Sequence, residues 1–520
     1  MFVRIVGISA LVVAALSYLL SGINASAERP PYIQGRNKTV LFLTNAEHGL
    51  NNVLVATASS LMEHHPDVEV HFASFPALQS TIERISSAMR RKTPASRDIL
   101  FHPLSGVALS QATAQIGMTA RTMTHPPAAA GIAKFADIAQ GMICPWTADE
   151  YIDIFNELGA LIDDINPAVI VLDTLFRPAV DITRQKNWLH AFITPNTLID
   201  NFLAEQPNGA MFWKYPAISS GFSFPVPLRQ IPENIYLNAR VIYALMYLPA
   251  LSAVKAVLRS NGIQDPLNFY ALRRDDVPWI TQSTEGASIP VDYVPPNVTC
   301  AGPIVLSAGS AAEQDPELAA WLKKAPTVLI NLGSMIAYDE IRARVMASAV
   351  ADVLAEMDVQ FIWKARQDTT AGDFDWDAAL APLKPFIEAG RVRVFSWLTV
   401  DPASLLDTGD IVASVHHGGA NCYHETIASG VAHLILPVWV DLYSFAALAE
   451  DMGVGVWGCR ATSPDWTREC LRDSLLDLLD KGPVAQERRD AARILGDNVR
   501  KGGKGKDIAA GEIAKLACVR

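Results

Sequence analysis

Short apolar runs alternate with helical stretches through the first half of this chain, and this alternation constrains its fold more than any other feature. The run "AVIVL" near residue 170 has no polar position, which is typical of a parallel strand buried on both faces. We expect strands at 40–44, 68–75, 168–173 and 188–193, and helices at 53–64 and 177–186. Two strand–helix–strand units of this kind predict a parallel sheet with helices packed on it.

The same pattern restarts in the second half. A Pro-, Gly-, Ala- and Ser-rich stretch follows Tyr293 and indicates an interdomain linker. Beyond it we expect strands at 328–332, 360–364, 392–395, 411–415 and 433–436, with helices at 340–356 and 443–452. The fold class is therefore α/β with two doubly wound sheets, and we place the two domains at residues 28–300 and 301–482.

The first 27 residues resemble a targeting segment. Arg4 precedes an apolar run at 5–20, and the small residues Ala25, Ser26 and Ala27 follow at signal-cleavage spacing. This pattern favours a cleaved signal peptide over an uncleaved anchor and leaves both open. Either one directs the chain into the secretory pathway, to the ER lumen or ER membrane or to secretion. Asn37 and Asn297 begin N-x-T triplets that fit glycosylation there.

Composition narrows the range of partners. The chain has 54 acidic and 43 basic residues, a net charge of −11, which argues against a nucleic-acid partner. Its six cysteines form no C-x-x-C pair, and fifteen full pairings remain open.

The helical stretch 233–260 has a strongly apolar centre. It fits a core helix kinked at Pro249, and it also fits a lipophilic acceptor pocket or a peripheral membrane contact.

The residues with the clearest chemistry follow the expected strand 411–415. His417, Gly418 and Gly419 form a turn, and a helix is expected to begin near residue 420. A helix start presents unpaired N–H groups and partial positive charge, which suits a phosphate. His417 and Asn421 can donate to phosphate oxygens, while Glu425, one turn further, can accept from ribose hydroxyls. The sequence predicts a nucleoside diphosphate site here; a plain Gly-rich turn is the alternative.

Two other interpretations of the polar motifs fail. "HGGA" occurs in the oxyanion loop of esterases, but that chemistry needs a G-x-S-x-G elbow, which the sequence lacks. "DFDWD" at 373–377 has the spelling of a metal-binding DxD motif. It follows a polar stretch rather than an apolar strand, so we interpret it as a solvated acidic loop. We expect no metal and no cofactor.

The first half offers a proton acceptor. His48 lies in the polar loop after the strand 40–44, and Asp173 ends the strand 168–173 at the same expected sheet edge. A histidine oriented by a buried carboxylate can take a proton from a hydroxyl near neutral pH. An exposed loop histidine and a strand-end turn are the plainer alternatives for these two residues. Together they predict a His48–Asp173 base.

These motifs carry a family resemblance. "HGGAN", then Glu425 and "GVAHLILPVWVDL", resembles the donor-binding signature of family 1 glycosyltransferases, which use UDP-sugars. Sixteen positions separate Glu425 from Asp441, as the family shows, and "TVLINLGSM" resembles its first donor-domain strand. "TNAEHGLNN" resembles the loop with its catalytic histidine. The resemblance implies the GT-B fold, with two facing Rossmann-like domains and a cleft between them, and helices within 483–520 that cross back to the first domain.

The resemblance also implies roles for residues. Trp397 would stack on uracil and Asp441 would hold sugar hydroxyls. The donor site it implies consists of Ser334, Trp397, His417, Gly419, Asn421, Cys422, Glu425, Asp441 and Leu442. Leu442 stands where the family has Gln, and leucine cannot replace an amide that both donates and accepts. The sugar, glucose or glucuronic acid, is therefore left open.

The predicted function is inverting transfer of a hexose from a UDP-sugar to a hydroxyl of a lipophilic small molecule. His48 acts as base, Asp173 stabilises the imidazolium, and His417 with the helix start stabilises the leaving UDP. Leu442 motivates an alternative from another class, a catalytically weak or inactive UDP-sugar or lipid-binding relative.

Overall fold

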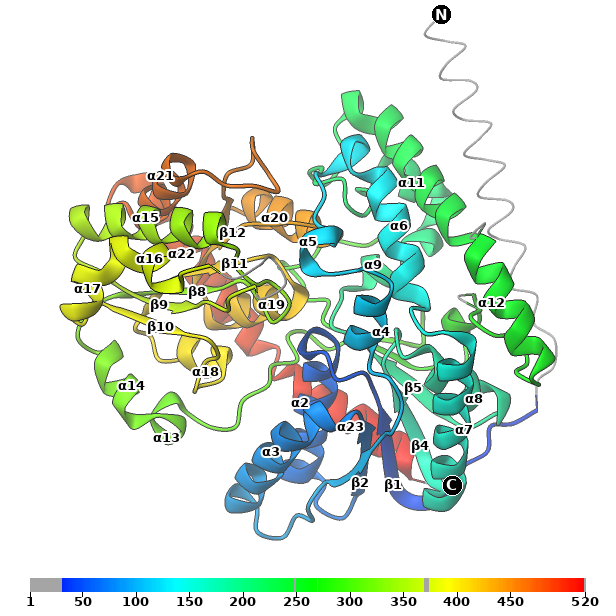
Figure 1. Cartoon of the computed structure of the whole chain (residues 1–520). Helices are drawn as coiled ribbons and strands as arrows, with labels where there is room; N and C mark the ends of the chain where they lie inside the picture. Colours follow the sequence, from blue (N-terminus) through cyan, green and yellow to red (C-terminus); the bar gives the residue numbers. More distant parts are fainter. Residues whose placement is uncertain (1–29, 247–248, 269, 369–373, 519–520) are drawn as a thin grey trace, which may run out of the picture. The chain divides into compact units, whose positions relative to one another are not determined.

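The computed structural model describes residues 30–246, 249–268, 270–368 and 374–518 (Figure 1). The chain forms two compact units. Unit 1 comprises Met1–Thr119, Ile132–Ile304 and Gly503–Arg520, and unit 2 comprises Ala120–Gly131 and Val305–Gly502. The predicted signal or anchor at 1–27 lies outside the described residues.

Unit 1 is built on a sheet of seven parallel strands in the order β3-β2-β1-β4-β5-β6-β7. Its order reverses between β1 and β4, as in a Rossmann-like fold, which confirms the predicted class. The strands are β1 (Arg36–Leu43), β2 (Glu69–Ser74), β3 (Leu100–Pro103), β4 (Pro167–Leu172), β5 (His190–Ile193), β6 (Trp279–Thr281) and β7 (Val298–Cys300). All six side chains of β4 are buried, as its apolar run predicted.

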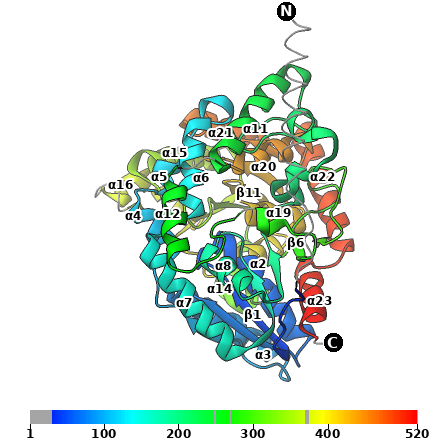
Figure 2. The same ribbon diagram turned by 90° about the vertical axis from the view of Figure 1, so that its right-hand side faces the viewer.

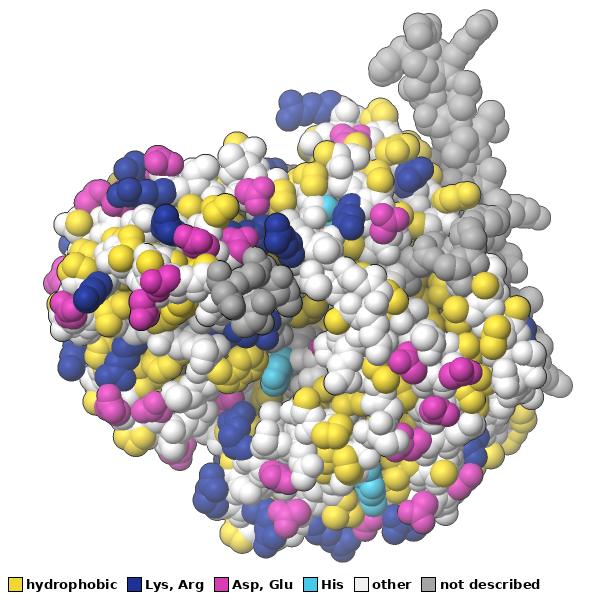
Figure 3. Space-filling model, viewed as in Figure 1, with side chains coloured by type: hydrophobic (Ala, Val, Ile, Leu, Met, Phe, Trp, Pro, Cys, Tyr) yellow, Lys and Arg dark blue, Asp and Glu magenta, His cyan; other side chains and the backbone are white. Residues whose placement is uncertain are grey.

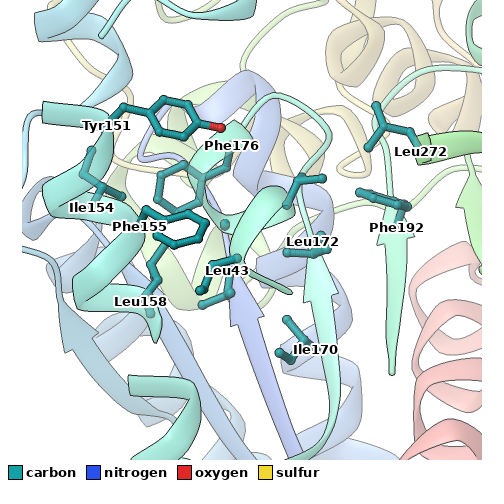
Figure 4. Close-up of a cluster of buried hydrophobic side chains, with 14 of the residues drawn as sticks. Leu43, Tyr151, Ile154, Phe155, Leu158, Ile170, Leu172, Phe176, Phe192 and Leu272 are labelled. Atoms are coloured by element: carbon teal, nitrogen blue, oxygen red, sulfur yellow. The ribbon is translucent and has the colours of Figure 1, made fainter. Parts of the chain in front are cut away.

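Helices cover both faces of this sheet. The helices of unit 1 include α2 (His48–His64), α3 (Gln79–Lys92), α4 (Leu109–Gln115), α6 (Ile132–Ile143), α7 (Ala148–Ile165), α8 (Arg177–Gln185), α11 (Ile231–Met246), α12 (Pro249–Ser260) and α23 (Gly505–Ala517). Figure 4 shows side chains of α7, among them Phe155 and Leu158, directed at Leu43 of β1 and Ile170 of β4. These four residues are at most 6% exposed, so truncating one to alanine costs about 2–5 kcal/mol.

Unit 2 has a second parallel sheet, with six strands in the order β10-β9-β8-β11-β12-β13. They are β8 (Thr327–Asn331), β9 (Gln360–Lys364), β10 (Val392–Phe395), β11 (Ile411–His416), β12 (Ala432–Ile435) and β13 (Gly455–Trp457). The main helices are α5 (Ala120–Met123), α15 (Glu340–Glu356), α16 (Trp376–Leu380), α17 (Lys384–Glu388), α19 (Ala420–Ser429), α20 (Leu442–Asp451), α21 (Arg468–Leu479) and α22 (Pro483–Lys501).

The two units are interleaved along the chain more than we expected. The main boundary between the units falls between Ile304 and Val305. Segment 120–131, however, belongs to unit 2 although the chain on both sides of it belongs to unit 1. The C-terminal part is also divided, since α22 stays in unit 2 while α23 packs against α2 and β1 in unit 1 (Figure 2). In the predicted helical stretch 233–260 the structure describes α11 up to Met246 and α12 from Pro249, and residues 247–248 lie outside the described residues.

Cys459 and Cys470 form a disulfide in unit 2, while Cys144, Cys300, Cys422 and Cys518 are free thiols. On the face that Figure 3 shows, basic and acidic side chains intersperse over the described residues. Among the described helices, none combines the length and the apolarity that a membrane span requires.

Candidate active site

The Gly-Gly turn after β11 has the geometry that the sequence predicted. β11 ends at His416 and α19 begins at Ala420, with Gly419 at the N-cap position and no side chain capping the helix. Gly418 has a φ of +91°, and a Cβ there would lie 2.9 Å from the Leu442 carbonyl oxygen. Only glycine fits this position without strain. The first N–H groups of α19 are therefore left without a side-chain cap.

His417 is held between two glycines. A Cβ at Gly333 or at Gly419 would lie 2.6 Å from the His417 ring, so both positions need glycine for the imidazole to fit. His417 Nδ1 is buried and has no hydrogen-bond partner among the described residues. Burial, with a smaller effect of the Lys364 charge, lowers the pKa of His417 to about 4. The imidazole is thus neutral at physiological pH and has hydrogen-bonding capacity that the protein leaves unused.

Lys364 is the residue of this site that sequence reasoning missed. It ends β9, and its Nζ donates to the Gly333 carbonyl oxygen at 3.1 Å. The same Nζ lies 3.7 Å from the centroid of the Trp397 ring, a cation–π contact. Burial lowers the pKa of Lys364 to about 8. The sequence signal that could have predicted Lys364 is a cationic residue at the end of an otherwise apolar strand, "QFIWK". The carboxyl ends of parallel strands form the edge at which α/β proteins bind ligands.

Glu425 lies one turn inside α19 and is 7% exposed. Burial raises its pKa to about 8, Asp401 and Asp407 add to the rise, and Lys364 opposes it. The carboxyl group is therefore largely protonated at neutral pH and does not repel a nearby phosphate. Cys422, on the same helix, has a thiol whose pKa is raised by burial and by Glu425. Lys364, Cys422 and Glu425 thus form one interacting group.

The other predicted donor residues are placed less uniformly. Ser334 and Asn421 are half-buried, beside Gly333 and at the start of α19 respectively. Trp397 is 48% exposed, with Lys364 over its ring. Asp441 is half-buried and immediately precedes α20. Leu442 is 2% exposed, so its side chain belongs to the apolar core and offers nothing to a sugar.

In unit 1, the predicted base lies at the carboxyl ends of β1 and β4. His48 is the first residue of α2 and is half-buried. Asp173 is 2% exposed and directly follows β4. β1 and β4 are paired in register from Val40 opposite Val169 to Leu43 opposite Leu172, which brings the loops after both strands to one edge.

The Asp173 carboxylate is engaged by neighbours other than His48. Oδ2 accepts from Asn45 Nδ2 at 3.1 Å and from Asn45 N and Thr44 Oγ1 at 3.4 Å, and Oδ1 accepts from Leu175 N at 2.9 Å. The expected hydrogen bond to His48 is not among them. Burial raises the pKa of Asp173, and these hydrogen bonds oppose the rise. Asp173 therefore fixes the loop that carries His48 instead of contacting the imidazole directly.

Asn45 and Glu47 complete this edge and were not predicted. Glu47 Oε1 accepts from Ser110 N at 2.7 Å, and Glu47 Oε2 is buried without a partner among the described residues. Burial raises the pKa of Glu47, and the nearby Asp173 adds a small rise. The sequence signal for both was their place in the loop directly after an apolar strand.

A metal site was not expected, and the described residues contain no group of three or more His, Cys, Asp or Glu side chains suited to one. Asp373 of the "DFDWD" stretch lies outside the described residues. Asp375 accepts from Ala378 N and so caps α16.

Comparison with known proteins identifies the family. Residues 280–464 match the model of the family described as "UDP-glucoronosyl and UDP-glucosyl transferase". Over 453 residues the chain is 32% identical to "Glycosyltransferase sdnJ" of Sordaria araneosa, a match that covers 85% of the chain and 86% of that protein. The chain belongs to the family 1 UDP-glycosyltransferases. The predicted resemblance is thereby confirmed, and the protein is a hexosyltransferase that uses a UDP-sugar.

Other relatives match this UDP-glycosyltransferase over shorter stretches. The sterol 3-beta-glucosyltransferase of Leptosphaeria maculans is 26% identical over 221 residues, which is 41% of the chain but 13% of that relative. A solved UDP-glucosyltransferase of Polygonum tinctorium, capable of glucosylating indoxyl, has a TM-score of 0.58 at 17% identity and covers 95% of this chain and 100% of its own. A solved UDP-glucose:anthocyanidin 3-O-glucosyltransferase in complex with UDP has a TM-score of 0.53 at 14% sequence identity. That match covers 93% of this chain and 99% of the solved chain. This UDP-glycosyltransferase therefore has the GT-B fold, as predicted.

Proposed function

We propose that this UDP-glycosyltransferase transfers a hexose, with inversion at the sugar carbon, to a hydroxyl group of a lipophilic small molecule. Unit 2 binds the UDP-sugar at the turn after β11. Unit 1 binds the acceptor and supplies the base. Inversion follows from a single displacement, in which the acceptor oxygen bonds to the sugar carbon as the bond to UDP breaks and the hydroxyl proton passes to the enzyme.

The donor half of the proposal rests on polar groups at the carboxyl ends of the strands of unit 2. The start of α19 has no side-chain cap, and His417 Nδ1 is buried without a partner among the described residues. Lys364 ends β9, and its ammonium donates to the Gly333 carbonyl oxygen after β8. Negative charge grows on the diphosphate as the sugar leaves, and these groups stabilise it. Asn421 and Ser334 donate to phosphate oxygens, Glu425 contacts the ribose, and Trp397 offers an exposed ring face to uracil.

The acceptor half rests on unit 1. His48 takes the proton of the acceptor hydroxyl, and Asp173 keeps the β1–α2 loop in place through Asn45 and Thr44. Glu47 and Asp173 place two carboxyl groups at this edge, and burial raises the pKa of both. In its ionised form either group favours an imidazolium in the transition state.

The lipophilic nature of the acceptor has two supports. The relatives include sterol 3-beta-glucosyltransferases, which are named for a sterol acceptor. In unit 1, α11 and α12 carry large apolar side chains, of which Tyr243 is 61% exposed and Val257 is 44% exposed.

We propose a place in the secretory pathway for the same enzyme, because Cys459 and Cys470 form a disulfide and disulfides persist in oxidising compartments.

The observation that carries the proposal is His417 Nδ1, which is buried without a partner among the described residues, on a ring packed between Gly333 and Gly419 at an uncapped helix start. Calorimetry with UDP, followed by incubation with UDP-glucose and a panel of phenols and sterols, tests it. Binding of UDP with release of free UDP and a glycosylated product supports the transferase. Binding without turnover favours the non-catalytic relative that Leu442 suggests, and absence of UDP binding by folded protein overturns the proposal.

The sugar requires a separate measurement. Leu442 is buried, so Asp441 is the remaining side chain of the expected pair for sugar hydroxyls. Competition between UDP-glucose and UDP-glucuronic acid at equal concentrations, with products separated by mass, identifies the preferred donor. Asp441→Asn lowers kcat/KM for that donor and leaves the affinity for UDP within about twofold, because UDP lacks the sugar.

A further inference from the structure

Segment 120–131 is a part of the first half of the chain that folds into unit 2. It contains α5 and the turn through Pro126 and Pro127, and it returns to unit 1 at Ile132 (Figure 1). Its His125 hydrogen-bonds residues of unit 2 that are more than 300 positions away in the sequence. Segment 120–131 contributes no strand to the sheet of unit 2 and none of the residues proposed to bind the donor, so its place in unit 2 needs another explanation.

His125 joins this segment to the loop after β12. Its backbone N donates to the Val438 carbonyl oxygen at 3.0 Å, and its ring Nε2 accepts from Val440 N at 3.0 Å. Its Nδ1 lies 2.7 Å from the Pro126 carbonyl oxygen, which can only accept. The proton of the neutral ring is therefore on Nδ1, and Nε2 is the acceptor for Val440.

The surroundings of His125 permit little movement. The residue is 2% exposed, and the Tyr443 hydroxyl donates to its carbonyl oxygen. A Cβ at Gly131 would lie 1.9 Å from the Pro126 carbonyl oxygen and 2.5 Å from His125 Nδ1, so the segment closes tightly over its own histidine. The position of the His125 ring is thus fixed by contacts other than its hydrogen bond to Val440.

Val440 needs such a partner. It has a φ of +40°, which a β-branched residue rarely adopts, because its side chain crowds the backbone there. Conformations of this kind cost about 1–3 kcal/mol and persist where neighbouring groups hold them. Val440 directly precedes Asp441, so the direction in which Asp441 leaves the backbone depends on the conformation that His125 holds.

The loop also borders an open space. A small pocket is lined by Arg121 and Thr124 of the segment, by Ile336, Asp339 and Arg342 after β8, and by Val438 and Trp439 of the loop. The first two residues of the loop 438–441 therefore border this pocket, at the carboxyl ends of β8 and β12. This is the edge at which the proposed function places the donor.

We infer that His125 is a positioning residue for the sugar of the donor. It accepts the Val440 N–H and thereby holds the 438–441 loop in the strained form that presents Asp441 to the sugar. The inference rests on the proposed function. It adds that donor-sugar recognition depends on a segment far from the donor-binding signature in sequence.

Two substitutions separate this role from simple packing. His125→Leu keeps a comparable volume and removes the acceptor, whereas His125→Gln keeps an amide oxygen that can accept the Val440 N–H. We expect His125→Leu to raise KM for the UDP-sugar about fivefold to tenfold, the effect of one lost hydrogen bond, with UDP affinity within about twofold. His125→Gln should recover KM to within about threefold of the unaltered enzyme.

A double-mutant cycle with Asp441 decides the outcome. If His125 acts through Asp441, His125→Leu in an Asp441→Asn background adds little to the rise in KM. Fully additive effects, equal loss of UDP and UDP-sugar affinity, or equal defects in the Leu and Gln variants overturn the inference. Thermal unfolding of each variant verifies that it is folded. Failure of the unaltered enzyme to bind UDP instead contradicts the proposed function, so the two failures are distinguishable.

Discussion

The carboxyl edges of the two sheets carry opposite chemistry. At the edge of unit 1, Asn45 Oδ1, Glu47 Oε2 and Asn51 Oδ1 in the loop and helix after β1 are buried oxygens without a hydrogen-bond partner among the residues the structure describes. At the edge of unit 2, His417 Nδ1 in the turn after β11 is such an atom, and the Lys364 ammonium lies near it. The same Rossmann-like architecture thus presents acceptors and carboxyl groups in one unit and a cation with a helix start in the other.

This difference shows how two copies of one fold can each perform a different part of a reaction. An oxygen-rich edge suits a substrate that gives up a proton, and a cationic edge suits a leaving group that gains negative charge. Glu425 fits this division although it is acidic, because its raised pKa keeps it largely neutral beside Lys364. Each of the following predictions tests one side of the comparison.

The largest effect is expected for the base in unit 1. His48→Ala should lower kcat by about 10²- to 10⁴-fold, the usual contribution of a general base, and leave UDP affinity near normal. Steady-state kinetics and UDP calorimetry measure the two quantities. His64→Ala, at the other end of α2, is the matched control and should retain kcat. Equal losses of kcat and of UDP affinity in His48→Ala would contradict the assignment.

The second effect concerns stability in unit 2. Glu425 has a pKa of about 8 in the folded protein and an ordinary one when unfolded, so its contribution to stability is full at low pH and declines as pH rises from about 4.5 towards 8. Glu425→Gln removes this decline and should raise the free energy of unfolding by about 2–4 kcal/mol at pH 7.5, with little change at pH 4. Denaturant unfolding at both pH values tests this. Glu388→Gln, an exposed substitution on α17, should show no such pH dependence.

The third effect concerns the cation of unit 2. Lys364→Met should weaken UDP binding by about 10- to 100-fold and leave uridine binding unchanged, because the amine acts on the phosphates. Since the pKa of Lys364 is about 8, UDP affinity should fall as pH rises through that value, and Lys364→Arg should flatten the fall. Lys384→Met, at an exposed position on α17, is the control for loss of one charge. Equal loss of uridine and UDP affinity would place Lys364 on the nucleoside instead.

The smallest effect concerns the loop of unit 1. Asn45→Ala removes the amide that binds Asp173 and should lower kcat about fivefold, roughly the value of one buried hydrogen bond, without changing UDP affinity. Combining it with His48→Ala should add almost nothing to the loss in kcat, because the loop acts through His48. A clear further loss in the double variant would mean that Asn45 acts on the acceptor directly.

The parts of the fold and site that the sequence predicted are local ones. The β11–α19 turn was predicted because an apolar run, two glycines and a helix start stand side by side between Ile411 and Glu425. The observed β9 and α15 have the bounds that their apolar patterns predicted, 360–364 and 340–356. Such features need only a few neighbouring residues and known backbone preferences.

The features that the sequence did not predict depend on residues far apart. The contact of Asp173 with Asn45 requires the register of β1 against β4, which no local pattern specifies. Segment 120–131 lacks a periodic pattern, and its hydrogen bonds to Val438 and Val440 become visible only once the chain is folded. The burial of Leu442 was hidden for the same reason, since a family position had suggested a ligand contact.

The position of α23 has a consequence for how the protein is made. Ser60 of α2, the helix that begins with His48, hydrogen-bonds Asp507 of α23 at 2.7 Å, and a Cβ at Gly505 would lie 2.4 Å from the Pro303 carbonyl oxygen. Unit 1 therefore lacks one of its packed helices until the ribosome has synthesised unit 2 and then residues 505–517. A recombinant fragment that stops at residue 304 leaves the face of α2 against which α23 packs uncovered.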